Sequence, residues 1–199
     1  MRYYIEHTME PAKMRSGSIE CYPWGGQYRP TTTFRVGHDE KSLRVLMCCE
    51  EVNPLARVHE RNGPVWCDSC MEFFVAPGLK RTDGYFNFEM NANGALLLHF
   101  GYSSDEYIVV DWPMASDLSL ETSSSNGHWD LDLHIPFALF SHYVPDFSYK
   151  SGLYIHGNFF KCGDEADPPH FGCHFPVRTH EGLLPNFHQP DCFGELILV

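Results

Sequence analysis

The sequence predicts an all-β fold, an antiparallel β-sandwich of the jelly-roll kind with few or no helices. Aromatic residues are abundant, with Phe 15, Tyr 10 and Trp 4, and they favour pleated surfaces over helices. Short runs with apolar alternation recur between turn signals, roughly eight to ten of them, as in sandwiches and jelly rolls. No run has a helical period over ten residues, which excludes parallel α/β architectures for want of crossover helices. At 199 residues we expect residues 1–199 to form a single domain.

The first strands are predicted after residue 30. Residues 1–30 show no clean period and are interrupted by Pro11, Pro23 and Pro30, so we expect an extended segment that covers the domain. The run T-T-T-F-R-V at 31–36, a polar turn and L-R-V-L-M-C-C-E-E at 43–51 then indicate strand, turn and strand.

A β-hairpin is predicted in the middle of the chain. Its arms are 71–75 and 85–91, and Pro77, Gly78, Asp83 and Gly84 between them favour a turn. The second arm alternates Phe86, Phe88 and Met90 with Tyr85, Asn87, Glu89 and Asn91, the period of a half-buried strand. In the same way Glu72 falls on the face opposite Met71, Phe73 and Val75.

Further strands are predicted toward the C-terminus. The apolar run A-L-L-L-H-F at 95–100 indicates a buried strand, and the irregular Ser- and Asp-rich stretch 102–126 indicates a long loop. W-D-L-D-L-H-I-P at 129–136 alternates without interruption, and residues 137–144 are compatible with one helical turn. Runs at 152–161 and 195–199 complete the predicted strands.

The composition argues against nucleic acid and membrane as partners. The formal net charge of −12 argues against nucleic acid, which needs clustered Lys and Arg. No stretch approaches the roughly 18 apolar residues of a membrane span, and the N-terminus lacks the apolar core of a signal peptide. As written, the chain is therefore expected to be cytoplasmic, or extracellular if an export signal was trimmed from it.

Eight cysteines raise the question of metal or redox chemistry. Cys67 and Cys70 form a C-x-x-C pair, but the pair runs into a strand, whereas redox pairs normally open a helix. A zinc site would need two more ligands, for which the candidates are Cys162, His170, Cys173, His174 and Cys192. The alternative is that the cysteines are buried free thiols that pack as small hydrophobic residues.

Trp66 and Glu72 together are the first candidates for a binding site. Sugars stack their C–H faces on aromatic rings and form directed hydrogen bonds with charged acceptors. An indole followed by a carboxylate, beside a strand that carries Asn and Glu, offers both. In the alternative interpretation Trp66 closes the end of the sheet and Glu72 pairs with Arg57 or Arg61.

Two segments carry a resemblance to a known family. P-V-W-C-D-S-C-M-E-F-F-V at 64–75 and N-F-H-Q-P-D-C-F-G-E-L-I-L at 186–198 resemble family 9 carbohydrate-binding modules, and more closely the family 9-like sugar-binding domains of gut and soil bacteria. The resemblance runs from about Pro30 to Val199. It implies a β-sandwich that grips a terminal sugar unit between two aromatic rings, here Trp66 and Phe187.

The resemblance also implies polar contacts. Glu72 matches a family carboxylate, Glu89 stands where the family has an arginine, and Asn91 matches in type; Asn87 and Asn186 are further candidates. Phe187 stands where better-studied modules have tryptophan. Because a carboxylate accepts where an arginine donates, the preferred sugar need not be the family's.

The resemblance implies no cofactor for chemistry but a structural calcium ion. Asp164, Glu165 and Asp167 and the 103–117 segment offer the oxygen ligands that calcium prefers; the alternative is a solvated acidic loop.

We therefore expect non-catalytic carbohydrate binding, linked to the use of polysaccharides such as xylan or glucan, with a mono- or oligosaccharide or a polysaccharide end as the partner. One alternative is a glycoside hydrolase that uses paired carboxylates such as Glu72 and Glu89. The other is a metal- or haem-binding sandwich, since the chain has 12 His and 7 Met.

Overall fold

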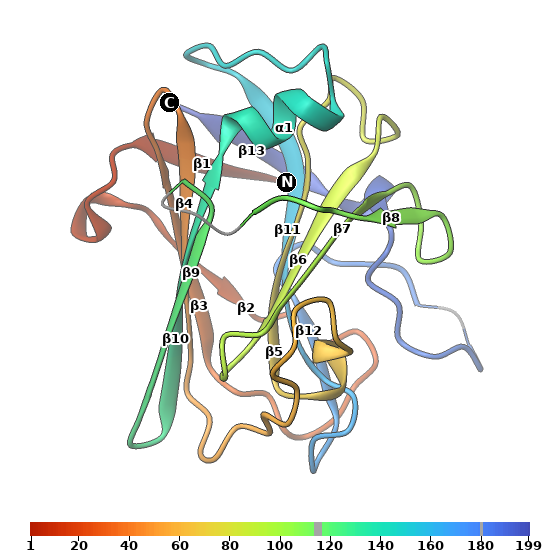
Figure 1. The fold of residues 1–199 in the computed structure, drawn as a ribbon. Helices are drawn as coiled ribbons and strands as arrows, with labels where there is room; N and C mark the ends of the chain where they lie inside the picture. The colour runs from red at the N-terminus through yellow and green to blue at the C-terminus, as the bar shows by residue number, and fades with distance from the viewer. Residues whose placement is uncertain (114–116, 180) are drawn as a thin grey trace.

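Two curled sheets face each other and form a β-sandwich (Figure 1). The computed structural model describes residues 1–113, 117–179 and 181–199. Its thirteen strands in these ranges form one hydrogen-bonded network, in which β1 joins the two sheets. Sheet A has the order β8 (Tyr107–Val109), β7 (Leu96–Gly101), β6 (Tyr85–Asn91), β5 (Cys70–Ala76), β11 (Tyr154–Gly163), β13 (Gly194–Leu198) and β1 (Arg2–His7), with β12 (His170–Cys173) also on β11. Sheet B has the order β1, β3 (Thr32–His38), β4 (Ser42–Cys49), β10 (His128–Pro136) and β9 (Ser119–Ser125), with β2 (Ser16–Ile19) also on β3.

The predicted fold class is confirmed. Strands dominate the described residues, where the one α-helix is α1 (Phe137–Tyr143), at the position predicted for a helical turn. Three short 3-10 helices lie in connections: η1 (Pro11–Lys13), η2 (Val65–Cys67) and η3 (Pro190–Cys192). Among these helices, none is long and apolar enough to cross a membrane.

The core lies between the sheets and is built from the alternating residues of each strand. Phe34 of β3 stacks on Phe159 of β11 with ring centroids 3.7 Å apart, so the two sheets are joined by aromatic packing. The alternation predicted for β10 is confirmed, because Trp129, Leu131 and Leu133 are all buried in this core.

The predicted hairpin is β5 and β6. Glu72 pairs with Glu89, and Phe73 pairs with Phe88. Phe73 and Phe88 belong to the core, whereas Glu72 and Glu89 point to the opposite face. That opposite face is buried too, since every residue of both strands is buried. The difference from the half-buried strand predicted by alternation arises because loops and a second hydrophobic cluster cover the outer face of sheet A.

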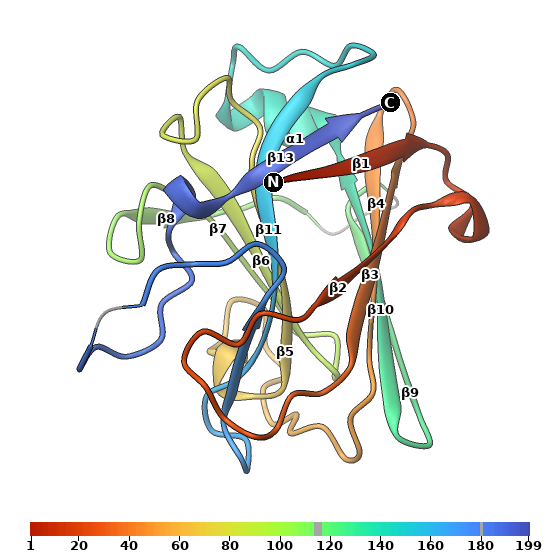
Figure 2. The ribbon, with the colours of Figure 1, turned by 180° about the vertical axis from the view of Figure 1, so that it is seen from behind.

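Residues 1–30, expected to be an extended covering segment, contain two strands of the sandwich. Residues 2–5 of β1 pair in parallel with β13, and Glu6 and His7 pair in parallel with β3. Figure 2 shows β1 beside β13, with the N-terminus at their start. The other strand pairs of the described residues are antiparallel. Only Tyr3 and Ile5 of β1 point into the core, which is too short an alternation to reveal a strand.

Candidate functional site

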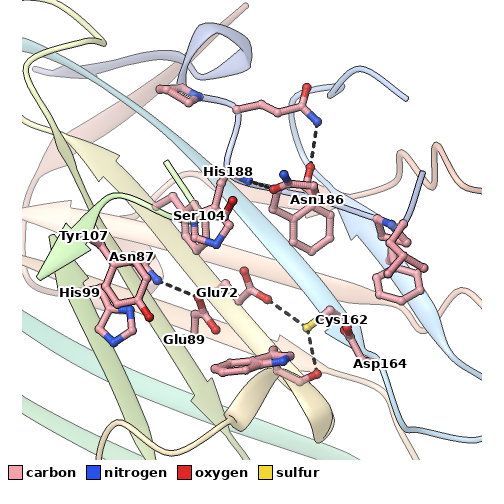
Figure 3. Close-up of a pocket in the computed structure, with 18 of the residues that line it drawn as sticks. Glu72, Asn87, Glu89, His99, Ser104, Tyr107, Cys162, Asp164, Asn186 and His188 are labelled. Atoms are coloured by element: carbon pink, nitrogen blue, oxygen red, sulfur yellow. Dashed lines mark hydrogen bonds between the residues drawn. The ribbon is translucent and has the colours of Figure 1, made fainter. Parts of the chain in front are cut away.

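A cavity of about 810 Å³ lies over the outer face of sheet A. Its floor consists of side chains from β5, β6, β7 and β11 that point away from the core, and its walls are η2, residues near β8 and the segment between β12 and β13 (Figure 3). Six of the seven predicted site residues line it: Trp66, Glu72, Asn87, Glu89, Asn186 and Phe187. Residues more than 100 positions apart thus meet in one site.

Trp66 forms one wall and is available to a ligand. Val65 beside it is fully buried and anchors η2, while Trp66 remains 41% exposed. The backbone is held against the end of β11, since Asp164 N–H donates to the Trp66 carbonyl (3.2 Å). An exposed indole on a fixed backbone is a suitable stacking surface.

Phe187 lines the same cavity but is packed differently. It is 7% exposed and stacks on Phe160 of β11, with ring centroids 4.2 Å apart and an interplanar angle of 16°. Trp24 contacts it edge-on at 5.6 Å. One face of the Phe187 ring is therefore occupied by the sheet.

The floor carries two neighbouring carboxyl groups and an amide. Asn87 Nδ2 donates to Glu89 Oε1 (2.8 Å), and Glu72 and Glu89 are directly opposed on adjacent strands. Burial, with the nearby charge of Glu89, raises the pKa of Glu72 well above its ordinary value, and burial raises the pKa of Glu89 to about 7. Around neutral pH the pair therefore retains a proton, so the floor offers a donor as well as acceptors.

A thiol and a third carboxyl group lie beside them. Cys162 Sγ donates to Glu72 Oε1 (2.9 Å), and Figure 3 shows Asp164 next to Cys162. Burial, followed by the charge of Glu165, raises the pKa of Asp164 to about 6. The floor thus combines several acidic groups that water does not fully solvate.

Comparison with known proteins identifies the family. The sequence model described as "Carbohydrate-binding family 9" matches residues 4–198. The chain belongs to carbohydrate-binding family 9. This confirms the family inferred from the segments at 64–75 and 186–198.

Solved structures share the fold of this family 9 chain. A candidate carbohydrate-binding protein from Bacteroides uniformis ATCC 8492 is 26% identical with a TM-score of 0.84, covering 100% of this chain and 99% of that one. A family 9 module from Caldicellulosiruptor kristjanssonii in complex with glucose is 12% identical with a TM-score of 0.70, covering 100% and 96%. A family 9 module from the same organism in complex with cellotriose is 13% identical with a TM-score of 0.68, covering 100% of this chain and 93% of that one. None of the curated proteins matches this chain.

Asn91, the seventh predicted residue, is not brought to the cavity of the family 9 chain. Its Nδ2 donates to the Val58 carbonyl (2.8 Å) and to Asp68 Oδ2 (2.9 Å), and its Oδ1 accepts from the backbone N–H groups of Asn93 and Ala95. With all four bonds made inside the protein, Asn91 holds loops rather than a ligand.

The alternative ion pair of Glu72 with Arg57 or Arg61 is also not formed. Arg57 binds Glu165, and Arg61 donates to the Trp112 carbonyl (2.6 Å). The nearest hydrogen-bond donor to Glu72 is instead a thiol.

Sequence reasoning missed several lining residues. His99 stacks on Tyr107 with ring centroids 4.2 Å apart, and His188 Nδ1 is 2.7 Å from the Tyr85 hydroxyl. Burial lowers the pKa of His188 to about 4, so this ring is neutral. A signal existed for His99, because alternation with Leu98 and Phe100 puts it on the outer face.

The zinc candidates are mostly separated. His170 contacts Lys161, His174 contacts the Ser18 carbonyl and Cys192 contacts Gln189. Cys162 alone lies opposite Cys70. All eight cysteines are free thiols.

Two of the loop carboxylates proposed as calcium ligands have different surroundings. Asp164 lines the cavity and Glu165 binds Arg57, and residues 114–116 of the 103–117 segment lie outside the described residues. A calcium site stays a prediction, which calcium titration would test.

Proposed function

We propose that the cavity binds the terminal unit of a carbohydrate without catalysing a reaction on it. The observation that supports this most strongly is a 41% exposed indole, Trp66, beside the buried Glu72, Glu89 and Asn87 in one cavity of a family 9 chain. An apolar ring face and converging hydrogen-bonding groups are what a pyranose requires.

In this proposal Trp66 and Phe187 are the two walls of an aromatic clamp. Trp66 supplies the larger free ring face, and Phe187, backed by Phe160, supplies a smaller rigid one. Asn186 is exposed on the rim; its Oδ1 accepts from the His188 N–H (2.8 Å), and its Nδ2 is left to donate to sugar hydroxyls. The floor groups Glu72, Glu89 and Asn87 bind the hydroxyls that point inward.

The proposed ligands are the ends of glucans or xylans encountered during polysaccharide use. Two solved relatives contain glucose and cellotriose, and a cavity of about 810 Å³ has room for more than one sugar unit. The floor has Glu89 where the family has an arginine, so hydrogen-bond acceptors replace donors. We therefore expect neutral sugars to bind more tightly than negatively charged uronic acids. A shallow clamp of this kind binds in roughly the micromolar to millimolar range.

A glycan array followed by calorimetry with Trp66→Ala tests the proposal. Loss of the stacking surface is expected to raise Kd at least about tenfold, equivalent to about 1.4 kcal/mol. Tyr154→Ala is the matched control, because Tyr154 is 50% exposed at the start of β11 and is not part of the cavity lining. Binding that is unchanged in Trp66→Ala, or weakened equally in both variants, would contradict the proposal.

Glycoside hydrolysis is the second candidate, because Glu89 has a pKa of about 7 and lies opposite Glu72. A hydrolase needs its two carboxyl groups on either side of the scissile bond, whereas these two share the floor. We therefore expect no release of reducing ends from any glycan that the array identifies. Release that is abolished by Glu89→Gln would establish the enzyme instead.

A further inference from the structure

Two short motifs place thiols and carboxyl groups together on the outer face of sheet A. Cys70 and Glu72 form a Cys-x-Glu on β5, and Cys162 and Asp164 form a Cys-x-Asp at the end of β11. Cys162 pairs directly with Cys70 across the antiparallel strands. Since residues two apart share a face of a sheet, the register brings both thiols and both acids to one side.

The side chains converge as closely as ligands of one ion. One ligand atom each from Cys70, Glu72 and Cys162 lies within 4.8 Å of the others, and Cys162 Sγ is 2.9 Å from Glu72 Oε1. A tetrahedral zinc ion, with bonds of about 2.3 Å to sulfur and about 2.0–2.2 Å to oxygen, separates its ligand atoms by roughly 3.5 Å. Only small side-chain shifts would therefore be needed.

The cluster is buried, and no Lys or Arg of the described residues forms a salt bridge with Glu72. Arg178 lines the same cavity, but its salt-bridge partner is Asp191 (3.8 Å). Cys70 is 0% exposed, and Glu72 and Cys162 are each buried. Lys161 is the adjacent residue of β11, but its Nζ contacts Glu51 (3.4 Å) and His170 (2.6 Å) on the inner face. A divalent cation would neutralise the acids that neighbouring side chains leave without a basic partner.

We propose that Cys70, Cys162 and Glu72 bind a thiophilic divalent cation of the zinc class at the floor of the cavity. Two thiolates and a carboxylate suit zinc better than calcium or magnesium, which prefer oxygen alone. Asp164, which lies next to Cys162 on the cavity side (Figure 3), offers a further oxygen ligand. Binding replaces three water ligands of the hydrated ion by two thiolate sulfurs and one carboxylate oxygen. The two thiol protons, and the proton of Glu72 where that carboxyl group is protonated, pass to solvent, so no oxidant or reductant is needed.

This site shares Glu72 with the proposed sugar site but depends on different further residues. The thiols and Glu72 are positioned by the pairing of β5 with β11, whereas the sugar site also needs Trp66 and the 183–191 segment. The two proposals can therefore fail separately.

Zinc titration of the reduced protein, residues 1–199, against a chromophoric chelator tests the site. We expect one Zn²⁺ per chain, and more than about a 100-fold loss of affinity in Cys70→Ser and in Cys162→Ser, because even outer-shell partners contribute 10–100-fold. Cys192→Ser is the matched control, because Cys192 is half-buried, free and outside the cluster. The Zn²⁺ affinity of this variant should equal that of the wild type. Wild-type protein that binds no Zn²⁺, or serine variants that bind it undiminished, would overturn the proposal.

A second readout covers variants that fold poorly. Co²⁺ substituted for Zn²⁺ should give a thiolate-to-metal charge-transfer band in the wild type, retained in Glu72→Gln with at least about tenfold weaker affinity. Glu72→Gln conserves the shape of the side chain, and circular dichroism checks its fold. A cobalt spectrum without thiolate bands, or Glu72→Gln with wild-type affinity, would contradict the assignment of these ligands.

Discussion

Buried acids from neighbouring elements contact the two faces of β11, Glu51 through Lys161 and Glu72 through Cys162, and their environments are opposite in kind. On the inner face Glu51 contacts Lys161 (3.4 Å) and accepts hydrogen bonds from Ser69 (2.9 Å) and Trp129 (3.1 Å). On the outer face Glu72 lies opposite another acid, Glu89. One carboxylate is surrounded by donors, and the other faces a cavity.

The two environments move the acids' pKa values in opposite directions. Burial alone would raise the pKa of Glu51, but the charge of Lys161 and the hydrogen bonds from Trp129 and Ser69 hold it below its ordinary value. Burial raises the pKa of Glu72, and the neighbouring Glu89 raises it further. The comparison teaches that a buried acid with all its partners inside the protein is structural, whereas one that lacks them is ready for a ligand.

Removal of Lys161, the cation that Glu51 contacts on the inner face, should cause the largest loss of stability. Lys161→Met leaves Glu51 as a buried charge without its cation, which costs about 3–5 kcal/mol of unfolding free energy. Urea denaturation measures the loss. The double variant Lys161→Met with Glu51→Gln should recover part of it, because the unpaired charge is gone. A loss in Lys161→Met below about 1 kcal/mol would show that the pair is not structural.

The pH dependence of stability should separate the two faces. Glu89 has a folded-state pKa of about 7, above that of an unfolded Glu, so its contribution is present below about pH 4.3 and is lost as pH rises through 7, on the order of 3 kcal/mol. Glu89→Gln should therefore gain stability over the wild type progressively across this range, in chelator-containing buffer.

The stability contributed by Glu51 and His170 on the inner face should change with pH in the opposite direction. The pKa of Glu51 is lowered, and that of His170 is lowered to about 4 by burial and then by Lys161. Both contribute stability at neutral pH that is lost on acidification: from about pH 6.5 down to 4 for His170, and below about 4.3 for Glu51. Thermal unfolding of Glu89→Gln and wild type at several pH values checks both predictions: the loss of stability on acidification in Glu89→Gln reports on Glu51 and His170, and the difference between the two proteins reports on Glu89. Parallel pH profiles of the two proteins would show that Glu89 titrates normally.

Local patterns predicted the strands that have a clear apolar alternation, and the faces of their residues, because alternation depends on near neighbours. The prediction of a long loop over 102–126 was wrong, since β8 and β9 lie in that stretch; both are mostly exposed and carry no apolar alternation that would reveal them. The β5–β6 hairpin and the outward direction of Glu72 and Glu89 follow from alternation. The partners of those residues depend on distant chain. Asn91 looks like a site residue by alternation, yet it bonds to Val58, 33 residues away, and Asp68, 23 residues away. No period in residues 183–191 signals that they cover sheet A.

Asn91→Ala tests the structural role assigned to that amide. The change leaves the Val58 carbonyl and the Ala95 N–H without the bonds that they make to Asn91 (2.8 and 3.0 Å), and we expect a loss of about 2 kcal/mol in unfolding free energy. Sugar affinity of the folded variant should be unchanged in calorimetry. Loss of affinity at unchanged stability would return Asn91 to the binding site.

Asn87→Ala is the matched change on the cavity floor and should have the smallest effect on stability. Its Nδ2 bonds to Glu89 Oε1 (2.8 Å), and water in the cavity can replace that donor, so the unfolding free energy should change by less than about 1 kcal/mol. A sugar hydroxyl loses a partner, which should raise Kd by about fivefold, equivalent to about 1 kcal/mol. If Asn87→Ala and Asn91→Ala alter stability and affinity alike, the division of the outer face of sheet A into structural and ligand-binding amides is wrong. If they differ as expected, two carboxamides four residues apart on one strand face differ in role because only one of them has all its partners inside the protein.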